Sequence, residues 1–316
     1  MKPIAALMAF LLATTAVAAA FERPSENECR RALGNLFEEP EPLRTFLTPD
    51  GDFRPVPLPR PTDWLAQHPE RGQSYDEFRT WTTHQPDATR HTLYLLPFGD
   101  FSEDAGPSLA EMRAYAAHFF QMEVKLLPPY YPHDLEFSPR QHARGGQRQL
   151  LTTDILRFLE TKLPPDAYCI LGITLDDLYP QPAWNYVFGQ ASLENRVGIY
   201  SLARYDPAFW KEERGARYRE LMLQRACKVL VHETAHMFGL QHCIYYECVV
   251  NGSNGLTETD GQPQSLCPVC LRKLHAAIGF DARKRYTDLA RFYRAHQWFD
   301  ELDLANRQLA RIRPPE

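Results

Sequence analysis

The sequence lacks the features that would assign it to several simple classes of protein. It has no excess of positive charge, because 35 Lys and Arg residues stand against 40 Asp and Glu residues and give a formal net charge of −5. A basic surface for nucleic acid is therefore disfavoured. The 16 glycines follow no triplet period, which excludes a collagen-like chain. No repeat of solenoid or propeller length is visible either.

Long apolar runs are scarce as well. Beyond the N-terminus no window approaches the ~18 apolar residues that a membrane-spanning helix needs. The 316 residues are 44% apolar and 24% charged, which is enough apolar material to bury a substantial core. The composition therefore predicts a soluble globular protein.

The first twenty residues have the pattern of an export signal. Met1 and Lys2 give a short positive start, an uncharged, mostly apolar run follows from Pro3 to Val17, and the segment ends with small-x-small patterns at 16–18 and 18–20. This order is typical of a cleaved secretory signal, and the run is short for a bilayer span. We expect cleavage after Ala18 or Ala20, export to the periplasm or the exterior, and no stable membrane anchor.

Residues 21–90 form a Pro-rich segment. Seven of the 25 residues from Glu38 to Thr62 are proline, which fixes φ and removes a backbone donor. An extended path is expected, either as a solvated linker or packed along the following domain.

Regular structure is expected from residue 91 to residue 316. Strands are predicted at 92–98, 124–127, 168–174, 185–188 and 197–201, and helices at 109–120, 150–163 and 217–238. A Cys-rich loop and a helical tail over 271–312 complete the chain. The order predicts one α/β or α+β domain of roughly 220 residues.

The chemistry of the chain is concentrated in the long predicted helix. His232 and His236 are four residues apart, so both imidazoles lie on one face and can bind one metal ion. Glu233 follows the first histidine, where its carboxylate can reach a water on that ion. Gly239 can end the helix in the left-handed conformation, and His242 then supplies a third nitrogen. Three protein ligands leave one zinc position open, as in catalytic sites.

The cysteines suggest a second metal site. Four of the seven follow His242 closely, in the order Cys243-x4-Cys248 and Cys267-x2-Cys270. Two short-spaced pairs are typical of a structural zinc site with four thiolates. Two alternatives stay open: disulfides, because an exported chain meets an oxidising environment, and a redox dithiol at Cys267 and Cys270.

The other three cysteines have no such pattern. Cys169 and Cys227 lie in apolar stretches and are expected in the core. Cys29 has no assigned role, and one hypothesis is that it caps the catalytic zinc.

These motifs resemble those of the archaemetzincin family of metzincin zinc metallopeptidases, most closely its archaemetzincin-2 branch. The resemblance rests on 232–243, with HExxHxxGxxHC, on Cys248 and on the CxxC at 267–270. It extends through 171–174, 177–180, 184–192 and 198–205, and covers about Pro61 to Tyr293.

The resemblance implies an α+β, metzincin-like fold with a mixed twisted sheet and a long active-site helix. It implies two Zn²⁺ ions, one catalytic at His232, His236 and His242, and one structural at Cys243, Cys248, Cys267 and Cys270. It also implies a peptidase acting on short peptides in an aminopeptidase-like manner, with a sheet edge near 185–191 where a peptide backbone can pair.

The expected mechanism uses a zinc-bound water with Glu233 as the general base. Tyr245, Tyr246 or a backbone N–H of the edge strand are candidates to stabilise the oxyanion. Where the family has a methionine, this chain has Val250, for which we expect a modest loss of metal affinity or rate. The alternative function is a zinc-stabilised peptide-binding protein with little turnover. A peptide is the expected partner, and a monomer the expected state.

Overall fold

The structure is a computed structural model. It describes residues 20–81, 85–102, 106–143 and 145–312. The predicted export signal lies almost wholly outside these residues. Within them, no helix has the length and apolar character to span a membrane.

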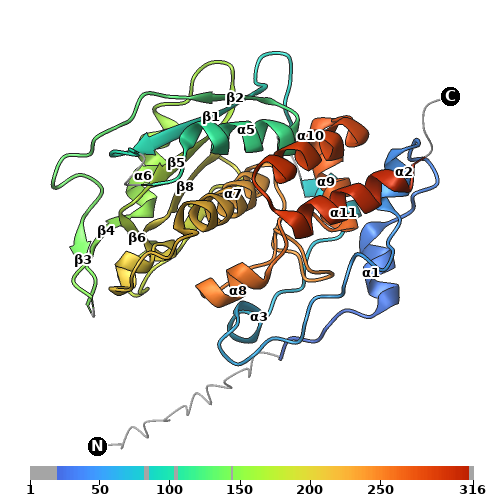
Figure 1. The fold of residues 1–316 in the computed structure, drawn as a ribbon, viewed down its shortest axis with the longest axis horizontal. Coiled ribbons are helices and arrows are strands. Elements are labelled where there is room, and N and C mark those ends of the chain that lie inside the picture. Colours follow the sequence, from blue (N-terminus) through green and yellow to red (C-terminus); the bar gives the residue numbers. More distant parts are fainter. Residues whose placement is uncertain (1–19, 82–84, 103–105, 144, 313–316) are drawn as a thin grey trace, which may run out of the picture.

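A five-stranded mixed sheet forms the centre of the fold (Figure 1). Its order is β2-β1-β5-β8-β7, with parallel pairing throughout except for β7, which runs antiparallel to β8 at one edge. The strands are β1 (Thr92–Phe98), β2 (Glu123–Leu126), β5 (Ala167–Thr174), β7 (Gly189–Ala191) and β8 (Val197–Ser201).

Helices cover both faces of this sheet, as the uniformly apolar strands predict. Every residue of β1, β5 and β8 is buried. Alternate side chains of β1 enter two different clusters: Leu93 and Leu95 pack with α5 (Leu109–Phe120) and α7 (Tyr218–Met237). Tyr94 and Leu96 pack with α6 (Thr152–Glu160) on the other face. The long helix α7 therefore lies directly against the sheet.

Most of the predicted elements are confirmed. β1 and α5 have the predicted bounds, and α7 differs from the prediction by one residue at each end. Gly239 has φ 88°, the left-handed conformation expected after the helix. The predicted strand at 185–188 is wrong: Val187 makes only an isolated bridge to Leu178, and the edge strand begins at Gly189.

A second, three-stranded sheet was not predicted. It contains β3 (Arg140–Gln141), β4 (Arg148–Leu151) and β6 (Asp177–Tyr179), in the order β3-β4-β6. The first residues of the predicted helix at 150–163 belong to β4, so α6 begins only at Thr152. These strands are too short for a period-2 pattern to be read from sequence.

The tail is helical, as predicted. Two short 3₁₀ helices, η1 (Ala203–Tyr205) and η2 (Pro207–Trp210), precede α7. After α7 the chain forms α8 (Leu256–Gly261), α9 (Pro268–Ile278), α10 (Ala282–Ala295) and α11 (Phe299–Ala310). Together with the mixed sheet and the cysteine loop, this gives a mixed α/β fold with a helical C-terminus.

The Pro-rich segment packs against the domain and is not a solvated linker. It contains the short helices α1 (Glu26–Leu33), α2 (Leu43–Leu47), α3 (Trp64–Gln67) and α4 (Tyr75–Trp81). Phe46 and Leu47 are fully buried, and Phe46 stacks on Tyr286 of α10. Arg272 of α9 donates to the backbone carbonyls of Leu33 and Asn35. Figure 1 shows α1 and α2 beside the C-terminal helices.

Candidate metal centres

Helix α7 and the turn after it bring three histidines together. His232 and His236 project from one face of the helix, and their Nε2 atoms are 3.1 Å apart. The left-handed Gly239 reverses the chain, so that His242 joins them with ring centroids 5.4 and 5.0 Å away. One ligand atom from each lies within 4.8 Å of the others.

This spacing fits a zinc ion. Zinc–nitrogen bonds of about 2.0–2.1 Å in a tetrahedron place the nitrogens roughly 3.3 Å apart. Burial, together with the neighbouring imidazoles, lowers the pKa of His232 and brings that of His236 to about 4. Both rings are therefore neutral at pH 7, which is the form that binds metal.

Glu233 lies beside the histidines at the wall of a cavity. Burial raises the pKa of its carboxyl group to about 8. Gly189 of the edge strand packs directly on it, because a methyl group at position 189 would overlap Glu233 Oε1. Helix α7 and the sheet edge thus meet at the Glu233 carboxyl group.

The four cysteines of the loop form a second cluster. Cys243, Cys248, Cys267 and Cys270 are buried, with sulfur atoms within 4.8 Å of one another. Cys243 Sγ and Cys267 Sγ are 3.6 Å apart, close to the roughly 3.8 Å edge of a zinc–thiolate tetrahedron and far from the 2.05 Å of a disulfide. All seven cysteines are free. The cluster could hold a metal ion.

Asn251 stabilises the cysteine loop through hydrogen bonds, a role that the sequence did not predict. Its side-chain NH₂ donates to the carbonyls of Cys243 and Tyr246, and its Oδ1 accepts from the Cys248 N–H at 2.7 Å. Val250 next to it is fully buried, and its carbonyl accepts from the Cys243 N–H. The turn at 248–251 is therefore fixed by hydrogen bonds of the Asn251 side chain and by a backbone bond to Cys243.

The histidines open onto a cavity of about 690 Å³. Its walls come from α3, from the rim segment 183–193 that includes β7, from α7, and from 249–262 with α8. Aromatic rings line one side: Trp64 lies against His68, and His68 stacks on Trp184 at 5.9 Å. Lys228 also lines the cavity, with its ammonium donating to the carbonyls of Thr259 and Gln262.

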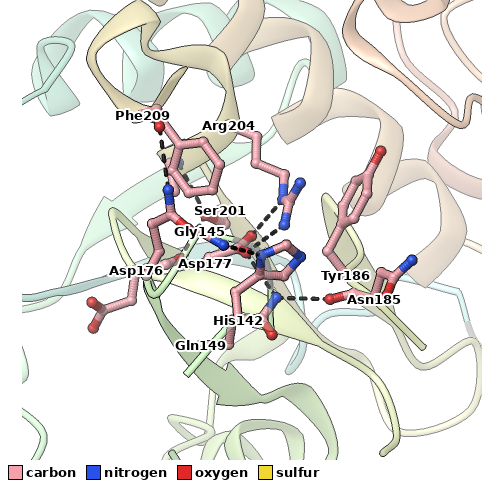
Figure 2. Close-up of polar contacts among 12 residues, drawn as sticks. His142, Gly145, Gln149, Asp176, Asp177, Asn185, Tyr186, Ser201, Arg204 and Phe209 are labelled. Atoms are coloured by element: carbon pink, nitrogen blue, oxygen red, sulfur yellow. Dashed lines mark hydrogen bonds and ion pairs between the residues drawn. The ribbon is translucent and has the colours of Figure 1, made fainter. Parts of the chain in front are cut away.

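A buried ion pair between Arg204 and Asp177 holds the rim segment in place (Figure 2). Arg204 Nε and Nη2 bind the two oxygens of Asp177 at 2.8 and 2.7 Å. Gln149 donates to Asp177 Oδ2 and also to the backbone carbonyl of Asn185. The Arg204 guanidinium lies 3.5 Å from the Tyr186 ring centroid, and the Tyr186 hydroxyl donates to the carbonyl of Asn254. The rim is thus fixed to the three-stranded sheet, to η1 and to the segment before α8.

Some residues singled out in the sequence lie elsewhere. Tyr245 and Tyr246 are buried and do not line this cavity, whose tyrosines are Tyr186 and Tyr205. Cys29 lies in α1 with its sulfur 3.6 Å from the Tyr245 carbonyl, away from the three histidines. Cys169 and Cys227 are fully buried, as expected, and burial raises the pKa of both thiols. The loop places both tyrosines against the N-terminal segment.

Glu70 is a residue of the site that sequence reasoning missed. It comes from the Pro-rich segment, and its Oε1 lies 2.9 Å from His242 Nδ1 and 2.8 Å from Trp64 Nε1. Burial opposes its ionisation, but the hydrogen bonds from His242 and Trp64 outweigh burial and hold its pKa below the ordinary value. No local motif signals this contact across 172 residues of sequence.

Comparisons with known proteins agree with the motifs. Residues 161–276 match the family described as Peptidase family M54. Archaemetzincin-2 of Homo sapiens is 36% identical over 276 residues, covering 79% of this chain and 75% of the human protein. Archaemetzincin-1 of Homo sapiens is 33% identical over 254 residues, covering 72% of this chain and 51% of the relative.

Among solved structures, an archaemetzincin from Methanopyrus kandleri matches with a TM-score of 0.47 and 28% identity, covering 62% of this chain and 99% of that chain. The sequence relationship to archaemetzincin-2 is extensive enough to decide the family. The chain belongs to the archaemetzincin family and is a zinc metallopeptidase.

Proposed function

We propose that this chain hydrolyses peptide bonds in short peptides, in an aminopeptidase-like manner, with a catalytic zinc at His232, His236 and His242. Glu233 is the general base, and a structural zinc is held by Cys243, Cys248, Cys267 and Cys270. The observation that carries the proposal is the convergence of three imidazoles and the buried carboxyl group of Glu233 at the wall of a single cavity.

Each group of the chain has a defined task. Zinc, when bound, supplies a Lewis acid and lowers the pKa of a coordinated water to about 7. Glu233 takes a proton at its carboxylate and returns it to the leaving amine, a task supported by its place beside the three histidines in the cavity wall. The outer edge of β7 offers backbone groups to an extended peptide, because its other edge already pairs with β8.

The cavity supports a preference for short substrates. Trp64 and His68 from the N-terminal segment and Trp184 from the rim form a continuous aromatic wall beside His242. Such a wall limits the path of a long polypeptide and offers apolar surface to a peptide side chain. We also propose that the chain is a monomer and that it acts after export; the support for export is the residue pattern of 1–20.

The test compares wild type with Glu233→Gln on a diverse peptide mixture, read by mass spectrometry. The wild type should cleave, and the variant should be slower by at least ~100-fold with its zinc content unchanged. The positions of the cuts distinguish amino- from endopeptidase action. Retained activity in Glu233→Gln would exclude the general-base role.

The alternative of a peptide-binding protein without turnover rests on Val250, which stands where the resemblance to the family implies a methionine. Two inactive proteins, each with zinc bound at the histidines, would favour that alternative.

A further inference from the structure

We propose that Glu70 is a positioning residue of the metal centre: its carboxylate fixes the His242 ring so that Nε2 points to the metal. The N-terminal segment thereby supplies part of the site. This inference rests on the proposed role of His242 as a zinc ligand.

The three histidines are anchored in the same way but by different kinds of group. His232 Nδ1 lies 2.9 Å from the carbonyl of Val249, and His236 Nδ1 lies 2.6 Å from the carbonyl of Leu240. Both acceptors are backbone atoms. His242 Nδ1 lies 2.9 Å from Glu70 Oε1, a side-chain carboxylate. An acceptor at Nδ1 keeps the proton there and leaves the Nε2 lone pair for a metal.

The loop that carries His242 gives this ring less support than α7 gives the other two. His232 and His236 belong to one helix, whereas His242 follows the turn at Gly239. Its ring contacts Trp64 edge-on, with centroids 5.2 Å apart. Besides the other two histidines, the ring is therefore contacted by Trp64 and Glu70, which both belong to the N-terminal segment.

Glu70 is itself held in place. Trp64 Nε1 donates to the same Oε1 that His242 uses. The Trp64 backbone N–H in turn donates to Glu258 of α8, at 3.0 Å. Gly252 leaves room for the indole, because a side chain there would overlap Trp64. A chain of contacts thus runs from α8 through Trp64 and Glu70 to His242, and the carboxylate cannot turn away without breaking it.

Carboxylates that orient a ligating imidazole raise its basicity, and their loss costs about 10–100-fold in metal affinity. We therefore expect Glu70→Gln to weaken zinc binding at the histidines by about 10-fold and Glu70→Ala by up to about 100-fold. The Gln variant keeps the shape of the side chain and a neutral acceptor, so it separates the charge of Glu70 from its packing.

The experiment measures zinc release by competition with a graded chelator for full-length wild type, both Glu70 variants and Glu77→Gln. Glu77 lies in the same segment and pairs with Arg71 and Ser74, without touching a histidine. It therefore controls for damage to the segment. Substitution of the histidine site by Co²⁺ gives a second readout, since its visible absorption reports the geometry of the ligands independently of turnover.

The proposal is supported if the Glu70 variants bind one zinc ion more weakly and the second ion as tightly as wild type. The control Glu77→Gln should keep the zinc affinity and the cobalt spectrum of wild type. Wild-type affinity and spectrum in both Glu70 variants would overturn it. Equal loss of both ions would contradict the local role as well. A wild type that cleaves no peptide but shows the expected affinity pattern would reject the proposed activity alone, and one with no metal at the histidines would reject both.

Discussion

Gly189 leaves the space in which the Glu233 carboxylate lies. A side chain at this position would overlap both Glu233 Oε1 and the Cβ of Tyr200. The glycine is thus required by a close approach of strand and helix, and not by its backbone angle. The position of the proposed base, Glu233, therefore depends on the space left at Gly189 as well as on helix α7, which carries it.

We expect Gly189→Ala to displace this carboxylate and to lower kcat/KM by more than about 10-fold, while zinc content stays unchanged. Gly215→Ala is the matched control, because nothing lies within 4 Å of an added methyl group there. The measurement is steady-state cleavage of one peptide substrate. Full activity in Gly189→Ala would show that the carboxylate has room to move.

Single residues differ in how far the sequence reveals them. His232, Glu233, His236 and the four loop cysteines are found by local spacing, because a helix face or a short loop brings such residues together. Glu70 and Gly189 carry no such signal. Each acts on its neighbour through a contact made only by the folded chain.

At the scale of elements, the pair Arg204–Asp177 joins β6 and η1 to the rim of the cavity. Both side chains are almost completely buried, and Asp177 keeps a second donor in Gln149. Removing one partner leaves the other charge buried without compensation. This differs from the pair Arg217–Glu220, whose side chains are 77% and 52% exposed.

Arg204→Met should lower the free energy of unfolding by about 3–5 kcal/mol. Arg217→Met should change it by less than about 0.5 kcal/mol. Chemical denaturation of zinc-loaded protein measures both. The double variant Arg204→Met with Asp177→Asn should recover part of the loss, and a simple sum of the two single losses would contradict an uncompensated charge as the cause.

Asp166 joins the beginnings of β1 and β2. Tyr94 donates to Oδ1 at 2.7 Å, and Lys125 Nζ lies 2.9 Å from Oδ2. The Tyr94 hydrogen bond, followed by that of Lys125, lowers the pKa of Asp166 to about 2. Since the folded-state pKa is depressed, the stabilisation is complete above the ordinary value near 3.8 and is lost as the pH falls toward 2.

Asp166→Asn should therefore melt below wild type at pH 6, and the difference between the two Tm values should shrink as the pH falls from 4 toward 2. Thermal unfolding followed by circular dichroism at several pH values measures it. A difference that stays constant over this range would show that the charge of Asp166 is not the cause.

The elements could be predicted where apolar patterning is long and continuous. β1, α5 and α7 meet that condition, since each is set by packing on the sheet. The rim at 185–188 is apolar too, yet side chains of Arg140, Gln149 and Arg204 hold it and no strand forms. The apolar residues of this segment line the cavity. A run of apolar residues in the sequence looks the same whether it lines a cavity or forms a buried strand.

At the scale of the whole molecule, the cysteine cluster connects the loop after the three histidines to α9. Cys243 follows the histidines, Cys267 caps α9, and Cys29 of α1 lies nearby against the Tyr245 carbonyl. A structural zinc contributes its binding free energy to folding, because the unfolded chain has no site for it. We expect two zinc ions per chain.

Cys270→Ser should reduce zinc to about one ion or fewer per chain and lower Tm by more than about 10 °C, because part of that folding free energy is lost. Metal analysis together with thermal unfolding measures both effects. Cys227→Ala, a buried cysteine outside the cluster, should keep both ions. Two ions in Cys270→Ser would contradict the assignment.

The packing of the N-terminal segment depends on partners that are far away in the chain. Lys273 donates to the Gln73 carbonyl, and Arg311 donates to the Thr48 carbonyl across 263 residues. The proline content predicts an extended path, and both a solvated linker and a packed segment can follow such a path. The surface of α9 to α11, to which the segment binds, decides in favour of the packed segment.

The dependence of His242 on Glu70 has a consequence for the order of events during synthesis. A ribosome releases residue 70 long before residue 242, and α9 to α11, which hold the first segment in place, emerge last. Such non-local contacts form late, after the loop between them has closed. On the proposed role of Glu70, the growing chain lacks the carboxylate that supports His242 until its N-terminal segment has docked, and we expect full metal affinity and full peptidase activity only after α9 to α11 have folded against that segment.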